Sequence, residues 1–213
     1  MRLFAAVWPP EHVLDHLDVA LGAVRGAPSG LSQAVRWSAR ETWHLTTAFY
    51  GEQPEGAVPA LVGELAEVAA GVRPYELMLR GAGVFSHRTL WVGVGGDVET
   101  QRAVSGGCVD AGGVPDRRPR ERAHLTVGRV RPGSGPPRRG SSTNERGRSG
   151  PAPDREVDVA AGIVRALAVY EGPRWEVDEI LLMSSLPGAG RGGGPLYEVV
   201  ERFALGTRGR MEP

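Results

Sequence analysis

The chain has 213 residues, of which 41% are hydrophobic and 23% charged, so it can bury a sizeable core. Its 25 acidic residues balance its 25 basic ones, and a zero net charge gives no bulk signal of nucleic-acid binding. Cys108 is the one cysteine, which excludes an intramolecular disulfide and a cysteine-rich zinc site. Every basic residue is arginine, which excludes a lysine nucleophile and a nucleotidyl-lysine intermediate.

The N-terminal sequence MRLFAAVWPPEH contains only a short apolar run, which Pro9 and Pro10 end, so it does not resemble a signal peptide. No stretch of the sequence reaches the length of a membrane-spanning helix. We therefore expect a cytoplasmic protein that is monomeric and makes no membrane contact.

Apolar periodicity predicts helices and strands that alternate along the chain. In chain order the sequence predicts a strand at 2–8, a helix at 10–25, strands at 34–38 and 43–51, a helix at 56–71, strands at 75–85 and 89–96, a helix at 97–113, a strand at 122–130, a helix at 156–169 and strands at 174–185 and 196–205. The strands occur in pairs around the helices, which favours a mixed α+β fold over a doubly wound parallel sheet. Residues 131–156 are rich in Gly, Pro, Ser and Arg and are predicted to form a long mobile loop.

The stretch WHLTTAFYG (43–51) contains a histidine two positions before a threonine in a predicted strand. Side chains at i and i+2 share a face of a strand, so His44 and Thr46 are predicted to project together, with Ala48 next on that face. Thr47 and Phe49 would then face the other way. A single His-x-Thr is a weak signal, because so short a motif often occurs by chance.

A second copy of this pattern makes the signal specific. The sequence AHLTVGRV places His124 and Thr126 in another predicted strand, 80 residues further along the chain. With five histidines, about 0.2 copies of His-x-Thr are expected by chance. Both copies read His-Leu-Thr, and each has a small residue two positions later, Ala48 and Gly128, which we expect to leave room for a ligand.

Two histidines that face each other across a cleft can serve as base and acid in one reaction, because their pKa values lie near neutral pH. Threonine hydroxyls beside them can donate hydrogen bonds to an anion. This combination suits displacement at phosphorus and needs no metal. The symmetry of the two motifs does not distinguish the acid from the base.

The paired motifs and the sequences around them resemble the 2H phosphoesterase superfamily, and within it the RNA 2′,3′-cyclic phosphodiesterase family, also called the 2′-5′ RNA ligase family. The resemblance covers most of the chain. It includes MRLFAAVWPPEHV, VRWSARETWHLTTAFYGE, GAGVFSHRTLWVGV, AHLTVGRVRP and VDEILLMSSLPGAGRGGGPLYEVVERFAL.

The resemblance implies a single bilobal α+β domain over 1–213, with two antiparallel sheets related by pseudo-two-fold symmetry, helices outside and an active-site cleft between the lobes. It implies hydrolysis of a terminal RNA 2′,3′-cyclic phosphate to a 2′-phosphomonoester, with reversible 2′-5′ ligation in some members and no cofactor. It implies that His44 is the proton donor and His124 the proton acceptor, and that Thr46 and Thr126 hold the phosphate oxygens.

Several further residues are candidates for binding RNA or a nucleotide analogue. Phe49, Phe85 and Tyr197 are candidates for stacking on a base. Arg122 and Arg129 belong to a basic segment, 116–148, that surrounds the second motif and is a candidate for attracting phosphates. Strand parity predicts that Arg129 faces away from His124, so a role at the phosphate requires a bulge.

Other kinds of site are less well supported. His12 and His16 lie four residues apart on a predicted helix, but no further ligands accompany them, so no metal site is expected. No G-x-S-x-G element indicates a serine hydrolase. Two alternatives to RNA hydrolysis stay open, namely hydrolysis of a small cyclic nucleotide and binding of RNA ends without catalysis.

Overall fold

The structure is a computed structural model that describes residues 1–26, 31–113, 122–131 and 158–206. In these residues all strands belong to one antiparallel sheet, in the order β7-β4-β5-β6-β3-β1-β8-β9, with β2 also paired to β6. The strands are β1 (Arg2–Val7), β2 (Val35–Trp37), β3 (Leu45–Glu52), β4 (Tyr75–Phe85), β5 (Thr89–Gly96), β6 (His124–Val130), β7 (Glu171–Val177), β8 (Glu179–Leu186) and β9 (Leu196–Ala204). The predicted α+β fold class is confirmed.

The sheet consists of two halves that meet at one point. The first half-sheet contains β3, β1, β8 and β9, and the second contains β6, β5, β4 and β7. They join where Leu45 of β3 lies opposite Leu125 of β6. The two predicted antiparallel sheets are thus connected edge to edge in one curled sheet, and the strands at the connection are those that carry the His-Leu-Thr motifs.

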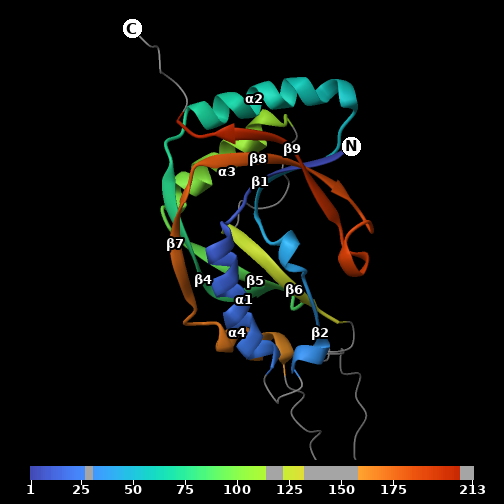
Figure 1. The fold of residues 1–213 in the computed structure, drawn as a ribbon, viewed down its shortest axis with the longest axis vertical. Coiled ribbons are helices and arrows are strands. Elements are labelled where there is room, and N and C mark those ends of the chain that lie inside the picture. The colour runs from blue at the N-terminus through green and yellow to red at the C-terminus, as the bar shows by residue number, and fades with distance from the viewer. Residues whose placement is uncertain (27–30, 114–121, 132–157, 207–213) are drawn as a thin grey trace, which may run out of the picture.

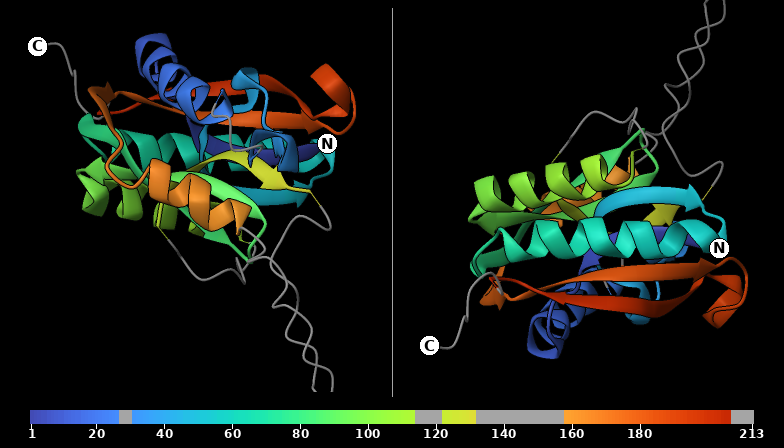
Figure 2. Two further views of the ribbon diagram at one scale, coloured as in Figure 1. Left: turned by 90° about the horizontal axis from the view of Figure 1, so that it is seen from below. Right: turned by 90° about the horizontal axis from the view of Figure 1, so that it is seen from above.

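Helices cover the outer faces of both half-sheets (Figures 1 and 2). The α-helices are α1 (Glu11–Arg25), α2 (Val58–Ala70), α3 (Val98–Ala111) and α4 (Val159–Ala166). Helix α1 contacts β7 and α4 contacts β4, whereas α2 contacts β8 and β9 and α3 contacts β3. Short 3-10 turns are η1 (Leu31–Ala34), η2 (Arg40–Thr42), η3 (Glu55–Ala57) and η4 (Arg191–Gly193).

Local signals explain where these helices begin. Helix α1 follows Pro10, whose fixed φ suits a helix start. Asp97 caps α3 by accepting a hydrogen bond from the backbone N–H of Thr100 at 2.9 Å. Asp158 caps α4 in the same way, through the N–H of Ala161 at 3.1 Å. Both caps satisfy N–H groups that have no partner within the helix.

The two faces of the first half-sheet are both apolar, but they serve different purposes. Leu3, Ala5 and Val7 of β1 face the main core. The alternate residues Phe4 and Ala6 belong to a separate small cluster on the other face. That cluster also contains Leu181 and Met183, with Trp8, Phe49 and Tyr197 packed against it. It forms an apolar lining next to the first His-Leu-Thr motif.

One predicted element is wrong in its connectivity. Residues 174–185 form two strands, β7 and β8, separated at Asp178. Strand β7 pairs with β4 in the second half-sheet, and β8 pairs with β1 in the first. Because a single residue, Asp178, separates the two strands and it is neither Gly nor Pro, the sequence gives no sign that the chain passes from one half to the other. The predicted loop 131–156 lies outside the described residues, apart from Arg131.

Candidate active site

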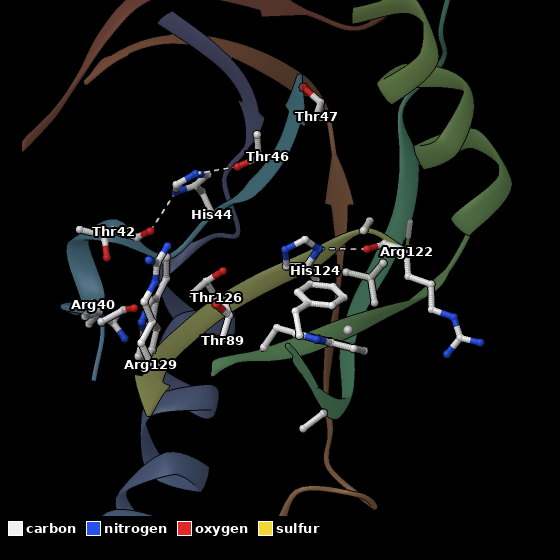
Figure 3. A pocket seen from close by; sticks show the side chains of 18 of the residues that line it. Arg40, Thr42, His44, Thr46, Thr47, Thr89, Arg122, His124, Thr126 and Arg129 are labelled. Atoms are coloured by element: carbon white, nitrogen blue, oxygen red, sulfur yellow. Dashed lines mark hydrogen bonds between the residues drawn. The ribbon is translucent and has the colours of Figure 1, made fainter. Parts of the chain in front are cut away.

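The two His-Leu-Thr motifs lie side by side at the junction of the half-sheets. Their central residues, Leu45 and Leu125, are opposite each other and fully buried. Because side chains alternate along a strand, the flanking histidines and threonines project to the other face, into a single cleft (Figure 3). This cleft has a volume of about 2270 Å³.

Each histidine is oriented by the carbonyl group two residues before it. The Nδ1 of His44 lies 2.8 Å from the carbonyl oxygen of Thr42, and the Nδ1 of His124 lies 3.1 Å from that of Arg122. A carbonyl oxygen only accepts, so Nδ1 must carry the hydrogen in both rings. In the neutral imidazoles Nε2 is therefore the basic nitrogen, and in His44 it lies 3.1 Å from the Thr46 hydroxyl, which donates to it.

The His44 ring is enclosed by aromatic side chains. It stacks on Trp8 at 5.3 Å between ring centroids and meets Phe4 at 5.0 Å and the edge of Tyr197 at 5.2 Å. Burial among these rings is the main reason why the pKa of His44 is lowered from 6.5 to about 4, and the nearby His124 contributes to this lowering. The hydrogen bond to the Thr42 carbonyl acts in the opposite direction but is the smaller effect. His44 is therefore neutral at pH 7 in the free protein.

The His124 ring has a different aromatic environment. It meets the Phe85 ring edge to face at 4.8 Å and lies 6.0 Å from the Trp91 ring. Phe85 and Trp91 stack on each other at 5.1 Å. The Trp91 ring lies over Gly83, where a Cβ atom would be 2.1 Å from it, so this glycine is required for the arrangement.

A β-bulge follows the threonine in both motifs. In β3 the pairing with β1 skips Thr47, and in β6 the pairing with β5 skips Val127. Beyond each bulge, side chains that regular alternation would place on one face of the sheet lie on the other face. Our prediction that Ala48 shares the face of His44, with Phe49 on the opposite face, is therefore wrong. Ala48 belongs to the main core, and Phe49 packs with the apolar cluster beside the cleft.

The bulge in β6 also determines where Arg129 points. Strand parity alone would direct it away from His124, but the unpaired Val127 turns it toward the cleft, where it extends toward His44 (Figure 3). Its charge is close enough to Tyr197 to lower the pKa of that hydroxyl, against the larger raising effect of burial. The small size of Gly128 has another cause than the predicted ligand space. A Cβ there would lie 2.9 Å from Val35 and 3.1 Å from the Arg36 carbonyl oxygen of β2.

The remaining candidate residues also line the cleft. Phe85 and Tyr197 are half-buried beside one histidine each. The Phe49 ring lies under the guanidinium of Arg2 at 5.0 Å. The side chain of Arg122 is exposed and points away from both histidines, while its carbonyl orients His124 (Figure 3).

Sequence reasoning missed Trp8 and Trp91, which contact the two histidines. A signal for Trp91 existed in the strand TLWVGVGG, where Trp91, Gly93 and Gly95 alternate with apolar residues. Beyond Thr89, such a strand has one core face and one face with a single aromatic ring followed by glycines. The orienting carbonyls of Thr42 and Arg122 have no sequence signal, because every residue has a carbonyl.

The cleft is strongly basic. Its described lining includes two carboxylates, Asp18 and Glu41, and the arginines Arg25, Arg36, Arg40, Arg80, Arg102, Arg122, Arg129 and Arg191. Asp18 is paired with Arg25 at 2.8 Å. Although the net charge of the whole chain is zero, the local charge of the cleft is positive and suits the binding of anions.

The described part of the chain holds neither a metal-ligand cluster nor a membrane-spanning helix. In residues 1–26, 31–113, 122–131 and 158–206, no three or more His, Cys, Asp or Glu side chains are grouped so that they could hold a metal ion. None of the helices in these same ranges is long and apolar enough to cross a membrane.

A curled antiparallel sheet with two His-x-Thr motifs facing one cleft defines the class of two-histidine phosphoesterases. In agreement, the family model described as LigT-like phosphoesterase matches residues 7–91. An RNA 2′,3′-cyclic phosphodiesterase from Methanothermobacter thermautotrophicus is 31% identical over 213 residues, which is 96% of this chain and 99% of that protein. The chain belongs to the LigT-like phosphoesterase family.

Other similar proteins agree with this assignment. An RNA 2′,3′-cyclic phosphodiesterase from Geobacillus stearothermophilus is 36% identical over 107 residues, which is 47% of this chain and 34% of that protein. A crystal structure of a Thermus thermophilus protein matches with a TM-score of 0.61 and 24% identity, over 98% of this chain and all of that one. E. coli LigT in complex with NADP+ matches with a TM-score of 0.65 and 20% identity, over 96% and 98% of the two chains. At these identities the structural matches show the fold.

Proposed function

We propose that this protein hydrolyses the terminal 2′,3′-cyclic phosphate of RNA to a 2′-phosphomonoester, by acid and base catalysis with two histidines and no metal. The observation that carries the proposal is that two histidines, each with Nδ1 held by a carbonyl group, face one basic cleft beside threonine hydroxyls. The full-length similarity to a protein named RNA 2′,3′-cyclic phosphodiesterase supports the same substrate.

In the proposed reaction, water attacks the cyclic phosphorus and the bond from phosphorus to the 3′ oxygen breaks. Nε2 of His124 accepts the proton of the attacking water, and Nε2 of His44 donates a proton to the departing 3′ oxygen. The phosphate stays on the 2′ oxygen. Thr46 and Thr126 donate hydrogen bonds to the non-bridging oxygens, and Arg129 balances their negative charge.

The low pKa of His44 makes its proposed role as donor depend on the substrate. In the free protein the imidazole is neutral at pH 7. An anionic phosphate next to the ring favours the imidazolium and raises the pKa, because opposite charges within about 4–6 Å stabilise the charged form. The phosphate thus brings about the protonation that its own hydrolysis requires.

RNA suits this cleft better than a small cyclic nucleotide alone. The arginines extend well beyond the two histidines, and a single cyclic phosphate carries one negative charge. Phe49, Phe85 and Tyr197 present aromatic surface beside the histidines for stacking on terminal bases. A 5′-hydroxyl in the position of the attacking water would give a 2′-5′ linkage by the same proton transfers, so ligation is included in the proposal.

The test is to incubate an RNA oligonucleotide ending in a 2′,3′-cyclic phosphate with the protein in EDTA and to identify the product by mass and phosphatase sensitivity. A 2′-phosphate is expected from the wild type, and rates lower by about 10²–10⁴ from His44→Ala and His124→Ala. His12→Ala is the matched control, because His12 is exposed on α1 outside the cleft. Turnover by both active-site variants would refute the mechanism, and binding without turnover by the wild type would favour a binding role.

A further inference from the structure

Beyond His124 the cleft continues between strand β5, the start of β6 and the first turns of helix α3. We call this part the α3 arm. Its lining residues are Arg80, Gly93, Gly95, Arg102, Ser105 and Arg122. None of them belongs to the acid and base machinery described above, although the carbonyl of Arg122 orients His124.

The floor of the α3 arm is formed by glycine. His124 lies opposite Gly93, and Gly93 lies opposite Arg80, so the three residues form one row across β6, β5 and β4. The outer two backbones are therefore two strand spacings apart, about 10 Å. Gly93 adds no side chain to this row, and a Cβ there would lie 3.1 Å from the Arg80 carbonyl oxygen and 3.3 Å from the Trp91 ring.

Gly95 continues this floor along β5. The stem of Arg80 lies flat across it, since a Cβ on Gly95 would be 2.5 Å from the Arg80 Cδ. An alanine there would force the arginine out of its position. Gly95 thus lets Arg80 lie along the floor of the arm.

The charge of the α3 arm is uncompensated. Arg80, Arg102 and Arg122 are exposed, and in the described part of the chain no carboxylate forms an ion pair with any of them. The contrast within the same cleft is Arg40, which pairs with Asp15 at 2.8 Å and also with Glu11. Three like charges gathered without acidic partners repel each other and attract a polyanion.

We propose that the α3 arm binds the phosphodiester backbone of the nucleotides that precede the terminal cyclic phosphate, with Arg80 and Arg102 each contacting a phosphate. This inference rests on the proposed function, because it assumes that the cyclic phosphate lies between the two histidines. Guanidinium groups bind phosphate oxygens in bidentate fashion, and exposed arginines without acidic partners among the described residues are free to do so. The protein then prefers an oligonucleotide to a mononucleotide.

The experiment compares kcat/KM for a trinucleotide ending in a 2′,3′-cyclic phosphate with that for the corresponding mononucleotide, over a range of salt concentrations. The variant is Arg80→Gln with Arg102→Gln, two exposed positions where folding is expected to survive. The control is Arg165→Gln, which removes the charge of an exposed arginine on α4 that does not line the cleft. Arg122 is left intact because its backbone holds His124.

The wild type and the control are expected to prefer the trinucleotide, and the double variant is expected to reduce that preference about tenfold. The slope of log kcat/KM against log salt for the trinucleotide should fall in magnitude by about 1.4, since each phosphate contact on a single strand contributes about 0.7. Equal values for both substrates in the wild type, or an unchanged preference in the variant, would overturn the inference.

Failure of the proposed function would be recognised separately, because the wild type would then hydrolyse neither substrate. In that case fluorescence anisotropy with a labelled trinucleotide 2′-phosphate decides the inference. Weaker and less salt-dependent binding by the double variant than by Arg165→Gln would support the α3 arm as a phosphate-binding site. Equal binding by the two proteins would refute it.

Discussion

The pKa of His44, with and without a bound anion, provides a direct test of the proposed mechanism. Burial lowers its pKa from 6.5 to about 4 in the free protein, which corresponds to about 3 kcal/mol against the imidazolium. Trp8, Phe4 and Tyr197 supply the apolar surroundings, and no carboxylate of the described residues forms an ion pair with the ring. Adding adenosine 2′-phosphate, the product form of a terminal nucleotide, places an anion next to the ring and should raise the pKa by about 1–3.

Proton and nitrogen NMR titration of the histidine rings measures both values, and the His44→Gln spectrum assigns the signal. We expect an apparent pKa near 4 without ligand and a clearly higher value with adenosine 2′-phosphate. A pKa of about 6 or more in the free protein would refute the argument from burial. A pKa that stays near 4 in the complex would refute His44 as the proton donor and would favour it as the base, with the roles of the two histidines exchanged.

Three further predictions concern stability and the hydroxyl groups. Thr46→Val removes the hydroxyl that bonds to His44 and should lower kcat about 10- to 100-fold, whereas Thr47→Val, at the buried bulge position, should leave kcat within about twofold. Gly128→Ala should lower the free energy of unfolding by about 1–3 kcal/mol in urea titrations, because the new Cβ would press on β2. Gly63→Ala is the control, since there is open space around this position on α2, and it should raise the free energy of unfolding by up to about 1 kcal/mol. The unfolded state takes up a proton at His44 near pH 6.5 and the folded state only near pH 4, so the wild type loses stability as the pH falls through this window. His44→Gln should reduce that loss by about 2 kcal/mol, less than the full pKa difference implies because the ring is partly exposed, and an identical pH dependence in both proteins would contradict the burial of His44.

The sequence contained enough information to identify the site but not its full geometry. Two His-Leu-Thr copies in strand-like surroundings predicted a shared cleft, because alternation in a strand depends only on local spacing. The contacts that orient the rings could not be predicted. They are made by the carbonyl groups of Thr42 and Arg122, and their position depends on the turn that precedes each strand.

The fold was predictable to a similar extent. Most helices and strands follow from apolar periodicity and from punctuation by Pro and Gly, as at Pro10 and at Gly26 around α1. The break at Asp178 was not predictable, since only one residue separates β7 from β8, although the two strands pair in different halves of the sheet. Pairing across the sheet depends on contacts between distant parts of the chain, which a local pattern does not contain.

The bulges explain how a duplicated three-residue motif builds a site with two different sides. In each copy the residue after the threonine, Thr47 or Val127, is buried and unpaired, so the fifth residue after the histidine returns to the cleft side. That position is Phe49 in one half and Arg129 in the other. The same kind of β-bulge therefore adds an aromatic ring to one side of the cleft and a positive charge to the other.

This difference between the two halves gives the two histidines different environments, which the symmetry of the motifs does not. In the proposed mechanism, the apolar cluster around Phe49 disfavours charge on His44 until a phosphate binds, and Arg129 attracts that phosphate. Two equivalent titratable groups can act as acid and base in one reaction only if their environments differ. Replacing Phe49 by a polar residue should therefore raise the free-protein pKa of His44 and weaken its dependence on the bound anion, and the NMR titration that tests His44 measures both effects. An unchanged pKa in Phe49→Gln would show that Trp8, Phe4 and Tyr197 alone set the environment of the ring.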